Sequence, residues 1–564
     1  MYKVVLFILL SLSLSAQESE NYIDTVFSKR LHFSKSAFPS DERSIKEYLE
    51  TKIDNLSSQN SNLVLLYYKE SKAGKHYCYT QQIFNIPVYR SMVKVNILNN
   101  TSSVDVISLT FSENDINLPV PKCDFLFPQE NNLIPANRKI ENHFFVFENL
   151  NGQKIYTFDQ HSYSGKTDTT AVVTVFNPDP LTSAQVNYGA PYYDNNNSTN
   201  SSLDAQLQFK TVALKFQNDT FYLENQYYQM KDFDAPNKTV TTSVKDTFQF
   251  NRSQDGFEDI NCFYHLTVCK DYLANIGYPS LVNNYLNIDA HAWSGAENSS
   301  FDEYTIPATL LFGEGGIDDA EDADVVVHEF GHFISANAAP FSNAGLQRKS
   351  IDEGFGDYLA SSYSRSISEY NWSKVFNWDG NNGSWQGRNS ASTKQYPDDY
   401  TGNQWKDGEI WSSVLMEINT DLGRNITDQL VFEALFMQST NTFMADAAIN
   451  LLKADTALFN AKYHCEIYKR LSERGLLSPS SCSVNELTIN GSYNFMQGGT
   501  LSILFPSYSS GNIYLYDING KQIDQCTFNN QKSIGYSLDK LAAGLYIIDI
   551  QTETESKQLK LLRY

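Results

Sequence analysis

The residues best suited to chemistry lie at 328–332, where the sequence reads His-Glu-Phe-Gly-His. On an α-helix, residues i and i+4 share a face, so His328 and His332 could bind one metal ion. Glu329 follows the first histidine and could take a proton from a metal-bound water as a general base. The alternative is two surface histidines on one helix. The apolar run at 325–327 favours a buried helix that holds the rings in place.

A second acidic segment follows at 352–358, with the sequence Asp-Glu-Gly-Phe-Gly-Asp-Tyr. A catalytic zinc ion takes three protein ligands and leaves one position for water. Glu353 could supply the third ligand, an oxygen. Asp357 lies one helical turn later and could accept the second N–H of a ligating histidine, His328, and so orient its ring. The alternative is an ordinary acidic helix start, because carboxylates favour helix N-termini.

The elements around these segments predict an α+β catalytic unit over residues 245–478. A helix carries apolar residues at helical spacing from Phe257 and ends before Gly277 and Pro279. The helix with the histidines begins near Asp322 or Asp324, either of which is a good N-cap. Strands are expected at 286–290 and 309–312. A β-rich region over 166–244, with alternating strand and turn signals, leads into this unit.

The N-terminus has the features of a secretory signal peptide over residues 1–16. Lys3 precedes an apolar run at 4–10, and small residues follow. The run is too short to span a bilayer; a buried first strand is the alternative. We expect no transmembrane segment elsewhere. Residues 20 to about 120 then form a small α/β unit with a helix over 44–56.

The composition is that of an acidic globular chain. The formal net charge is −22 over 564 residues, which argues against nucleic acid or an anionic membrane surface as the partner. The seven cysteines are too few and scattered for a disulfide scaffold, and no Cys-x-x-Cys pair suggests structural zinc. Cys465 and Cys482 could pair after export. The last 80 residues alternate strands and turns, which predicts a small β-sandwich over 485–564.

The segments at 328–332 and 353–357 together resemble the gluzincin clan, and within it the fungalysin-type peptidases, which are thermolysin-like. The resemblance implies a two-lobed zincin catalytic domain, with a mixed sheet and active-site helices, that binds one Zn²⁺. It implies a secreted metalloendopeptidase that cleaves proteins or peptides. Residues 17–165, with a core at about 40–115, resemble the family's propeptide, which would inhibit the enzyme as a zymogen.

Other segments resemble the family's substrate-binding elements. Residues 298–301 resemble the edge strand that pairs with substrate backbone, so Asn298 and Ser300 are candidate substrate contacts. Family members often carry a histidine three residues before a Gly-Glu/Gln-x-Trp block. Trp405 stands at that place, and the neighbouring Lys406 could substitute for the missing donor. Arg388 could grip a substrate carbonyl, or it could be a surface arginine in a Gly-rich loop.

The C-terminal 80 residues resemble the sorting domain of the Bacteroidetes type IX secretion system, with Gly544-Leu545-Tyr546 and Lys560-Leu561 as its marks. The resemblance implies export through the periplasm of a Gram-negative bacterium to the cell surface or the medium. It also makes the type IX machinery a partner. A carbohydrate-binding module is the alternative.

Two questions stay open at this point. A catalytically weak zincin fold kept for surface binding or adhesion is the alternative to a peptidase, and an aminopeptidase of the same clan is a lesser one. A second cation, Ca²⁺, could bind in the acidic turn at 318–322, although a solvated acidic turn is the simpler interpretation.

Overall fold

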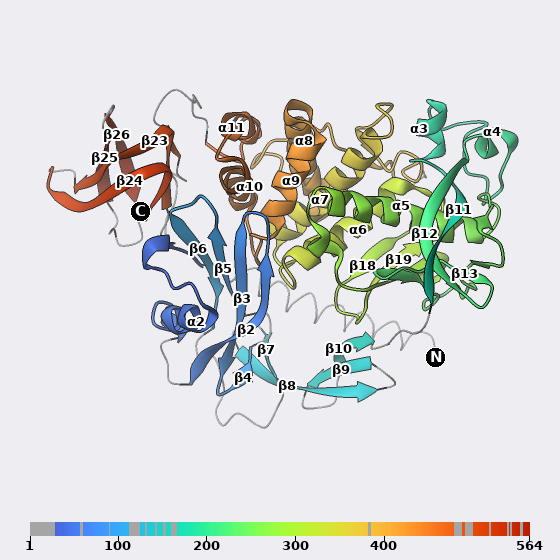
Figure 1. The fold of residues 1–564 in the computed structure, drawn as a ribbon, viewed down its shortest axis with the longest axis horizontal. Helices are drawn as coiled ribbons and strands as arrows, with labels where there is room; N and C mark the ends of the chain where they lie inside the picture. The colour runs from blue at the N-terminus through green and yellow to red at the C-terminus, as the bar shows by residue number, and fades with distance from the viewer. Residues whose placement is uncertain are drawn as a thin grey trace. The chain divides into compact units, whose positions relative to one another are not determined.

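The computed structural model of the chain consists of two compact units (Figure 1). The first comprises residues 1–136 and 430–564, and the second comprises residues 137–429. No helix among the described residues is long and apolar enough to cross a membrane. The predicted signal peptide lies outside the described residues. The residues described are 29–56, 60–88, 91–111, 125–129, 132–141, 144–149, 154–159, 166–381, 385–478, 488–490, 500–517, 520–537, 541, 544–552 and 556–563.

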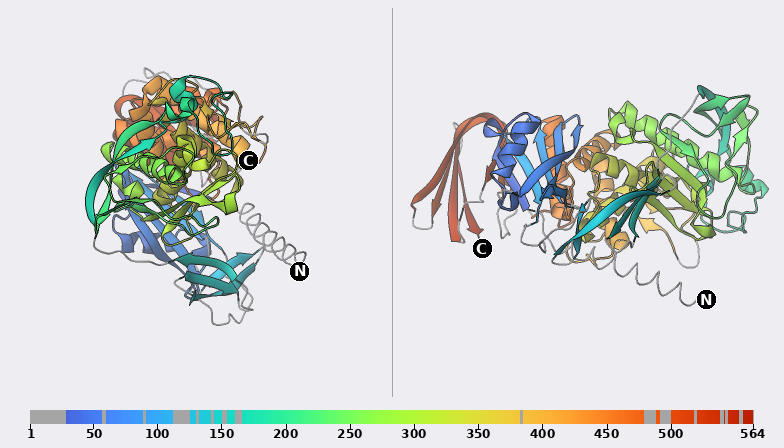
Figure 2. Two further views of the ribbon diagram at one scale, coloured as in Figure 1. Left: turned by 90° about the vertical axis from the view of Figure 1, so that its right-hand side faces the viewer. Right: turned by 90° about the horizontal axis from the view of Figure 1, so that it is seen from below.

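The first unit begins with an antiparallel sheet and one helix, as the sequence predicted. The helix α2 (Glu42–Glu50) starts at Asp41, whose side chain accepts a hydrogen bond from the Ser44 backbone, and it lies on one face of the sheet (Figure 2). Ile45 and Leu49 of α2 are buried in the same core as strand residues. The strands, in the order β1-β6-β5-β3-β2, are β1 (Lys29–Ser34), β6 (Ser103–Leu109), β5 (Met92–Leu98), β3 (Gly74–Ile83) and β2 (Ser61–Glu70), with β4 (Ile86–Pro87) paired to β3.

Helices from much later in the sequence belong to the same unit. They are α10 (Met444–Phe459), α11 (His464–Glu473) and the last turns of α9 (Arg424–Leu435). Arg30 pairs with Asp446 at 3.0 Å, and Lys453 forms an ion pair with Asp105. Charged side chains therefore tie the N-terminal sheet to these helices. Cys465 in α11 is disulfide-bonded, and its suggested partner, Cys482, lies outside the described residues.

Two further antiparallel sheets lie outside the catalytic region. Strands β7 (Phe125–Gln129), β8 (Asn132–Glu141), β9 (Phe144–Asn149) and β10 (Lys154–Asp159) pair in the order β10-β9-β8-β7. At the C-terminus, Ile513, Ile548 and their neighbours form a separate apolar core. Its strands are β22 (Thr488–Asn490), β23 (Thr500–Asp517), β24 (Gln522–Ser537), β25 (Gly544–Thr552) and β26 (Ser556–Arg563). They form one antiparallel sheet, and closure into a sandwich stays a prediction.

The second unit holds two sheets. The first, in the order β15-β13-β12-β11-β16, comprises β15 (Thr242–Ser243), β13 (Thr220–Tyr222), β12 (Gln208–Gln217), β11 (Thr167–Val175) and β16 (Thr247–Phe248). The second is a mixed sheet, in which β18 forms an antiparallel edge beside parallel strands. Its strands, in order, are β14 (Tyr228–Met230), β17 (Leu286–Ala292), β19 (Ala308–Gly313) and β18 (Ser299–Asp302). These positions confirm the predicted strands at 286–290 and 309–312.

Four long helices carry most of the chemistry: the first two pack against the mixed sheet, the third packs on the second, and the fourth packs on the third (Figure 1). They are α5 (Gly256–Asn275), α6 (Ala323–Ala338), α7 (Leu346–Arg365) and α8 (Gln404–Leu422). Asp322 is the N-cap of α6, because its side chain accepts a hydrogen bond from the Asp324 backbone. Shorter elements are α3 (Pro180–Ala184) and α4 (Ser201–Asp204), which precede α5, and β20 (Lys374–Val375) and β21 (Arg388–Asn389), which lie between α7 and α8 in the sequence.

Candidate metal centre

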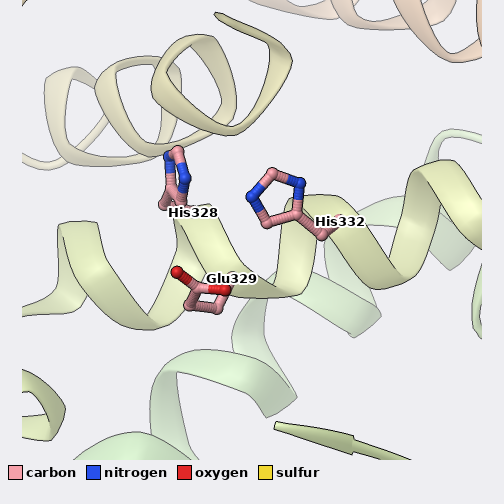
Figure 3. A group of neighbouring side chains, drawn as sticks. All are labelled: His328, Glu329 and His332. Atoms are coloured by element: carbon pink, nitrogen blue, oxygen red, sulfur yellow. The ribbon is translucent and has the colours of Figure 1, made fainter. Parts of the chain in front are cut away.

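The two histidines of the His-Glu-Phe-Gly-His segment lie in the middle of α6. Val326, Val327 and Phe330 of this helix are fully buried, so the helix is held in the core on the side away from the rings. Both imidazoles rise from one face of α6, side by side (Figure 3). His328, Glu329 and His332 offer donor atoms that all lie within 4.8 Å of one another. The i, i+4 prediction is therefore confirmed as geometry.

Asp352 orients the second histidine. The Nδ1–H of His332 donates to Oδ2 of Asp352 at 2.7 Å, which leaves Nε2 as the nitrogen free to bind a metal. Burial acts to lower the pKa of His332, but the Asp352 carboxylate outweighs burial and raises it to about 10. Sequence reasoning missed this role, although Asp352 stands directly before Glu353. The available signal was a buried carboxylate four residues after a buried arginine, Arg348, with which it pairs at 2.9 Å.

Asp357 lies beside the first histidine, as the helical spacing predicted. Its Oδ1 is 3.0 Å from Nδ1 of His328, close but not aligned as a hydrogen bond. The other ring nitrogen, Nε2, lies 3.5 Å from Oε2 of Glu353. The structure thus brings Glu353 to the metal-binding edge of His328. The two side chains would need to move only slightly for both to bind one ion.

Arg388 in β21 completes the charged cluster. Its Nη1 donates to Oε2 of Glu353 and to Oδ1 of Asp357, both at 2.9 Å. The side chain is only 14% exposed, so the alternative of a surface arginine is wrong. Burial raises the pKa of Glu353, but Arg388 and then His328 outweigh burial and hold it well below its ordinary value. Glu353 is consequently an anion, as a metal ligand must be.

Glu329 is buried beside the histidines, and its Oε2 has no hydrogen-bond partner within the described residues. Burial raises the pKa of Glu329 above its ordinary value, against the opposing effect of His332 and His328. A buried carboxylate oxygen without a donor is costly unless something fills the space before it. A raised pKa also makes this carboxylate a better proton acceptor than an exposed one.

Glycines allow the helices to approach closely enough to assemble this cluster. A Cβ on Gly356 of α7 would lie 2.6 Å from Nδ1 of His328, and one on Gly331 of α6 would lie 3.1 Å from the Cα of Gly356. A Cβ on Gly354 would meet the Gly408 carbonyl oxygen of α8 at 2.4 Å. Any larger residue at these positions would separate α6, α7 and α8 and move the ligands apart.

The start of α8 differs from the expectation. Gln404 faces the site, with its Nε2 3.4 Å from Oε1 of Glu353, whereas Trp405 is 55% exposed and Lys406 is exposed as well. Gln404 was not among the predicted site residues, and its closeness to Glu353 depends on how α8 packs on α7. Asn298 is exposed directly before β18, and Ser300 is half-buried within that edge strand.

The donor set suits zinc. Two imidazoles with free Nε2 atoms and one ionised carboxylate are the nitrogen and oxygen donors of a catalytic zinc site with an open fourth position. Carboxylates lie beside the Nδ1 atoms of both rings, Asp352 at His332 and Asp357 near His328, which leaves the Nε2 atoms to face a metal.

Comparison with known families agrees with this geometry. Residues 142–478 match the model of the fungalysin metallopeptidases. The chain belongs to this family. Residues 497–562 match the secretion system C-terminal sorting domain, so this fungalysin-family chain is a secreted protein of the type IX system, as its C-terminal marks predicted.

Individual relatives are distant and cover only part of each chain. The chain is 24% identical over 247 residues to the extracellular metalloproteinase MEP of Neosartorya fischeri, covering 34% of this chain and 37% of the relative. It is 26% identical over 252 residues to the extracellular metalloproteinase 3 of Arthroderma gypseum, with the same coverage. The chain thus spans little more than a third of these relatives' length. Among solved structures, it is similar to the precursor of protealysin from Serratia proteamaculans, with 14% identity and a TM-score of 0.35, over 44% of this chain and 87% of that one.

Proposed function

We propose that this fungalysin-family protein is a secreted zinc endopeptidase in which His328, His332 and Glu353 bind the metal. The observation that supports this assignment most directly is the convergence of these side chains on one side of α6. Nε2 of His328 lies 3.5 Å from Oε2 of Glu353, and donor atoms of His328, Glu329 and His332 lie within 4.8 Å of one another. Zinc bound there would polarise the scissile carbonyl and lower the pKa of its water from about 16 towards 7.

Glu329 is the proposed general base. Its Oε2 is buried next to both imidazoles and has no other partner among the described residues. That oxygen takes the proton of the attacking water and then delivers it to the leaving amine. The raised pKa of Glu329 suits a group that must hold the proton between these two transfers.

Five residues are proposed to position the substrate. Arg388 stands 2.9 Å from Glu353 and can donate from its remaining N–H groups to a substrate carbonyl oxygen. Strand β18 is at the edge of the described sheet, paired with β19 on one side only. Its other side can pair with an extended substrate backbone next to Asn298 and Ser300. Gln404 joins Lys406 as a candidate hydrogen-bond donor from α8, because its Nε2 lies 3.4 Å from Oε1 of Glu353, whereas Lys406 is exposed.

The N-terminal α/β unit is proposed to be an inhibitory propeptide over residues 17–165. Its support is the set of contacts that hold the sheet to α9 and α10. Buried His76 lies 3.7 Å from Glu433, and Ser71 donates to the same carboxylate at 2.5 Å. Such buried polar pairs give a specific rather than a merely apolar attachment.

The test compares the mature wild-type protein with Glu329→Gln. We expect both to contain one zinc ion per chain, and only the wild type to cleave casein, because glutamine cannot take the proton. Glu224→Gln, at an ion pair with Lys166 away from the site, is the matched control and should keep full activity. Cleavage that survives both zinc removal and Glu329→Gln would overturn the proposal. Stoichiometric zinc with no cleavage by wild type would instead favour the binding-only alternative.

A further inference from the structure

A second group of carboxylates lies on the other side of the start of α6, away from the histidines. Glu258 belongs to the first turn of α5, and Glu321 to a short 3-10 helix that directly precedes α6. Asp318 caps that 3-10 helix. One carboxylate oxygen from each residue lies within 4.8 Å of the others. The exposed fractions are 2% for Glu258, 2% for Asp318 and 0% for Glu321.

The partners of these carboxylates leave two buried oxygens unsatisfied. Glu321 is fully engaged, since it accepts hydrogen bonds from Nε of Arg252 at 2.9 Å and from Nε1 of Trp378 at 3.1 Å. Asp318 accepts from Asn197 through Oδ2 only, at 2.9 Å. Oδ1 of Asp318 and Oε2 of Glu258 have no hydrogen-bond partner within the described residues.

The charges of the group do not balance without an additional cation. Three buried carboxylates face one buried guanidinium, that of Arg252, which is also shared with the partly exposed Asp194 at 2.9 Å. If all three acids are ionised, the group holds two more negative than positive charges in a site closed to solvent. An unpaired buried charge costs several kcal/mol, and a single divalent ion would offset both charges.

The donor chemistry points to calcium. The group contains only carboxylate oxygens, which are the hard ligands that Ca²⁺ prefers, and neither histidine nor cysteine, which zinc prefers. Ca²⁺ binds oxygen at 2.3–2.6 Å, so two ligands of one ion can be up to roughly 5 Å apart. The donor atoms lie within 4.8 Å of one another, inside that limit, and three carboxylates suit Ca²⁺ better than Mg²⁺, which usually keeps several waters and binds only one or two carboxylates.

We propose that Glu258, Asp318 and Glu321 bind one Ca²⁺ ion that joins α5 to the beginning of α6. The ion stabilises the segment that directly precedes α6. Glu321 in this segment lies seven residues before His328. Its role is structural, and it does not depend on peptidase activity. A secreted protein meets calcium outside the cell at concentrations that sites with millimolar or tighter affinity can use.

Terbium luminescence tests the proposal, because Tb³⁺ replaces Ca²⁺ at oxygen sites and Trp378 contacts Glu321. The full chain carrying Glu329→Gln, which prevents self-cleavage, is stripped of metal and reloaded with one equivalent of zinc. We expect one equivalent of Tb³⁺ to become luminescent on tryptophan excitation and to be displaced by Ca²⁺. Glu258→Gln and Asp318→Asn should each weaken Ca²⁺ binding roughly tenfold or more, and Glu224→Gln should leave it unchanged.

Thermal unfolding keeps the proposal falsifiable if one variant folds poorly. Ca²⁺ should raise the unfolding midpoint of the parent chain, and the Glu258→Gln chain should lose that response. A chain that binds no Ca²⁺ by calorimetry, or that binds Mg²⁺ more tightly, would overturn the assignment. So would a Glu258→Gln chain that is as stable as the parent in saturating Ca²⁺. Zinc binding and casein cleavage are separate measurements, so failure here would leave the proposed function untouched.

Discussion

Replacement of Asp352 by asparagine tests how the zinc site is held. The carboxylate of Asp352 accepts four hydrogen bonds, two at each oxygen. Oδ2 receives the N–H groups of His332 at 2.7 Å and Asn343 at 2.9 Å. Oδ1 receives Ser335 at 2.5 Å and Arg348 at 2.9 Å. Asparagine keeps the shape but has one oxygen, so two of the four donors must face an NH₂ group.

The magnitude follows from which side keeps the oxygen. If the oxygen stays with Arg348, the NH₂ group faces His332, whose Nδ1 must become an acceptor and whose proton moves to Nε2. That tautomer cannot bind zinc, and loss of such a partner typically lowers metal affinity 10- to 100-fold, or about 1.4 to 2.7 kcal/mol. In either orientation buried Arg348 loses its anionic partner, which costs about 3 to 5 kcal/mol of stability, and when the oxygen stays with His332 the guanidinium also faces an NH₂ group.

The assay is competition for zinc between the metal-free protein and a chromophoric chelator, together with thermal unfolding. We expect Asp352→Asn to lose zinc affinity, stability or both by these amounts, and excess zinc to restore part of the cleavage activity. Ser335→Ala removes a donor from Oδ1 of Asp352 and an acceptor from Arg348 but leaves the contact between Asp352 and His332 in place, so it is the matched control for zinc affinity, which should stay close to wild type. A folded Asp352→Asn protein with wild-type zinc affinity and stability would refute the reasoning.

Three further predictions concern the packing, the charge and the pH dependence of the same unit. Gly356→Ala places a Cβ 2.6 Å from Nδ1 of His328; we expect weaker zinc binding in the chelator assay and about 1 to 3 kcal/mol lower stability in urea unfolding. Arg388→Met removes a cation beside the metal ligands; zinc binding should be retained or tightened while kcat/KM for a peptide falls by roughly 100- to 1000-fold, and an equal loss of both would contradict the proposed substrate contact. Burial lowers the pKa of His265 from 6.5 to about 4. Because the unfolded chain takes up this proton first, stability should be full above pH 6.5 and fall by about 3 kcal/mol towards pH 4; urea unfolding at several pH values should show this loss in the wild type but not in His265→Gln.

Local patterns predicted the elements well where one periodicity dominates. The i, i+4 spacing of His328 and His332 sufficed to place both rings on one helix face, because that relation depends only on helix geometry. The start of α6 near Asp322 or Asp324, of which Asp322 is the N-cap, and the helix at the start of the N-terminal unit were predictable for the same reason. The end of α5 at Asn275 also agrees with the predicted stop before Gly277.

The partners of the site could not be predicted in the same way. Arg388 was assigned equally to the surface, and Gln404 was overlooked in favour of Lys406, because a helix start alone does not show which of its residues faces a neighbour. Asp352 and Asp357 lie on the same helix, yet only the crossing of α7 over α6 decides which ring each carboxylate meets.

The sequence by itself therefore determined the chemistry of this protein. It placed two imidazoles and a base on one helix, an acid that serves as the third ligand on the next helix, and a secretion domain at the C-terminus. Only the tertiary structure decided which groups surround these residues. It places Asp352 behind His332, and it brings Glu258 next to Asp318, although the two are sixty residues apart in the sequence. The physical reason is range. Helix geometry acts between residues a turn apart, whereas the contacts of distant side chains depend on how closely glycines allow whole helices to pack.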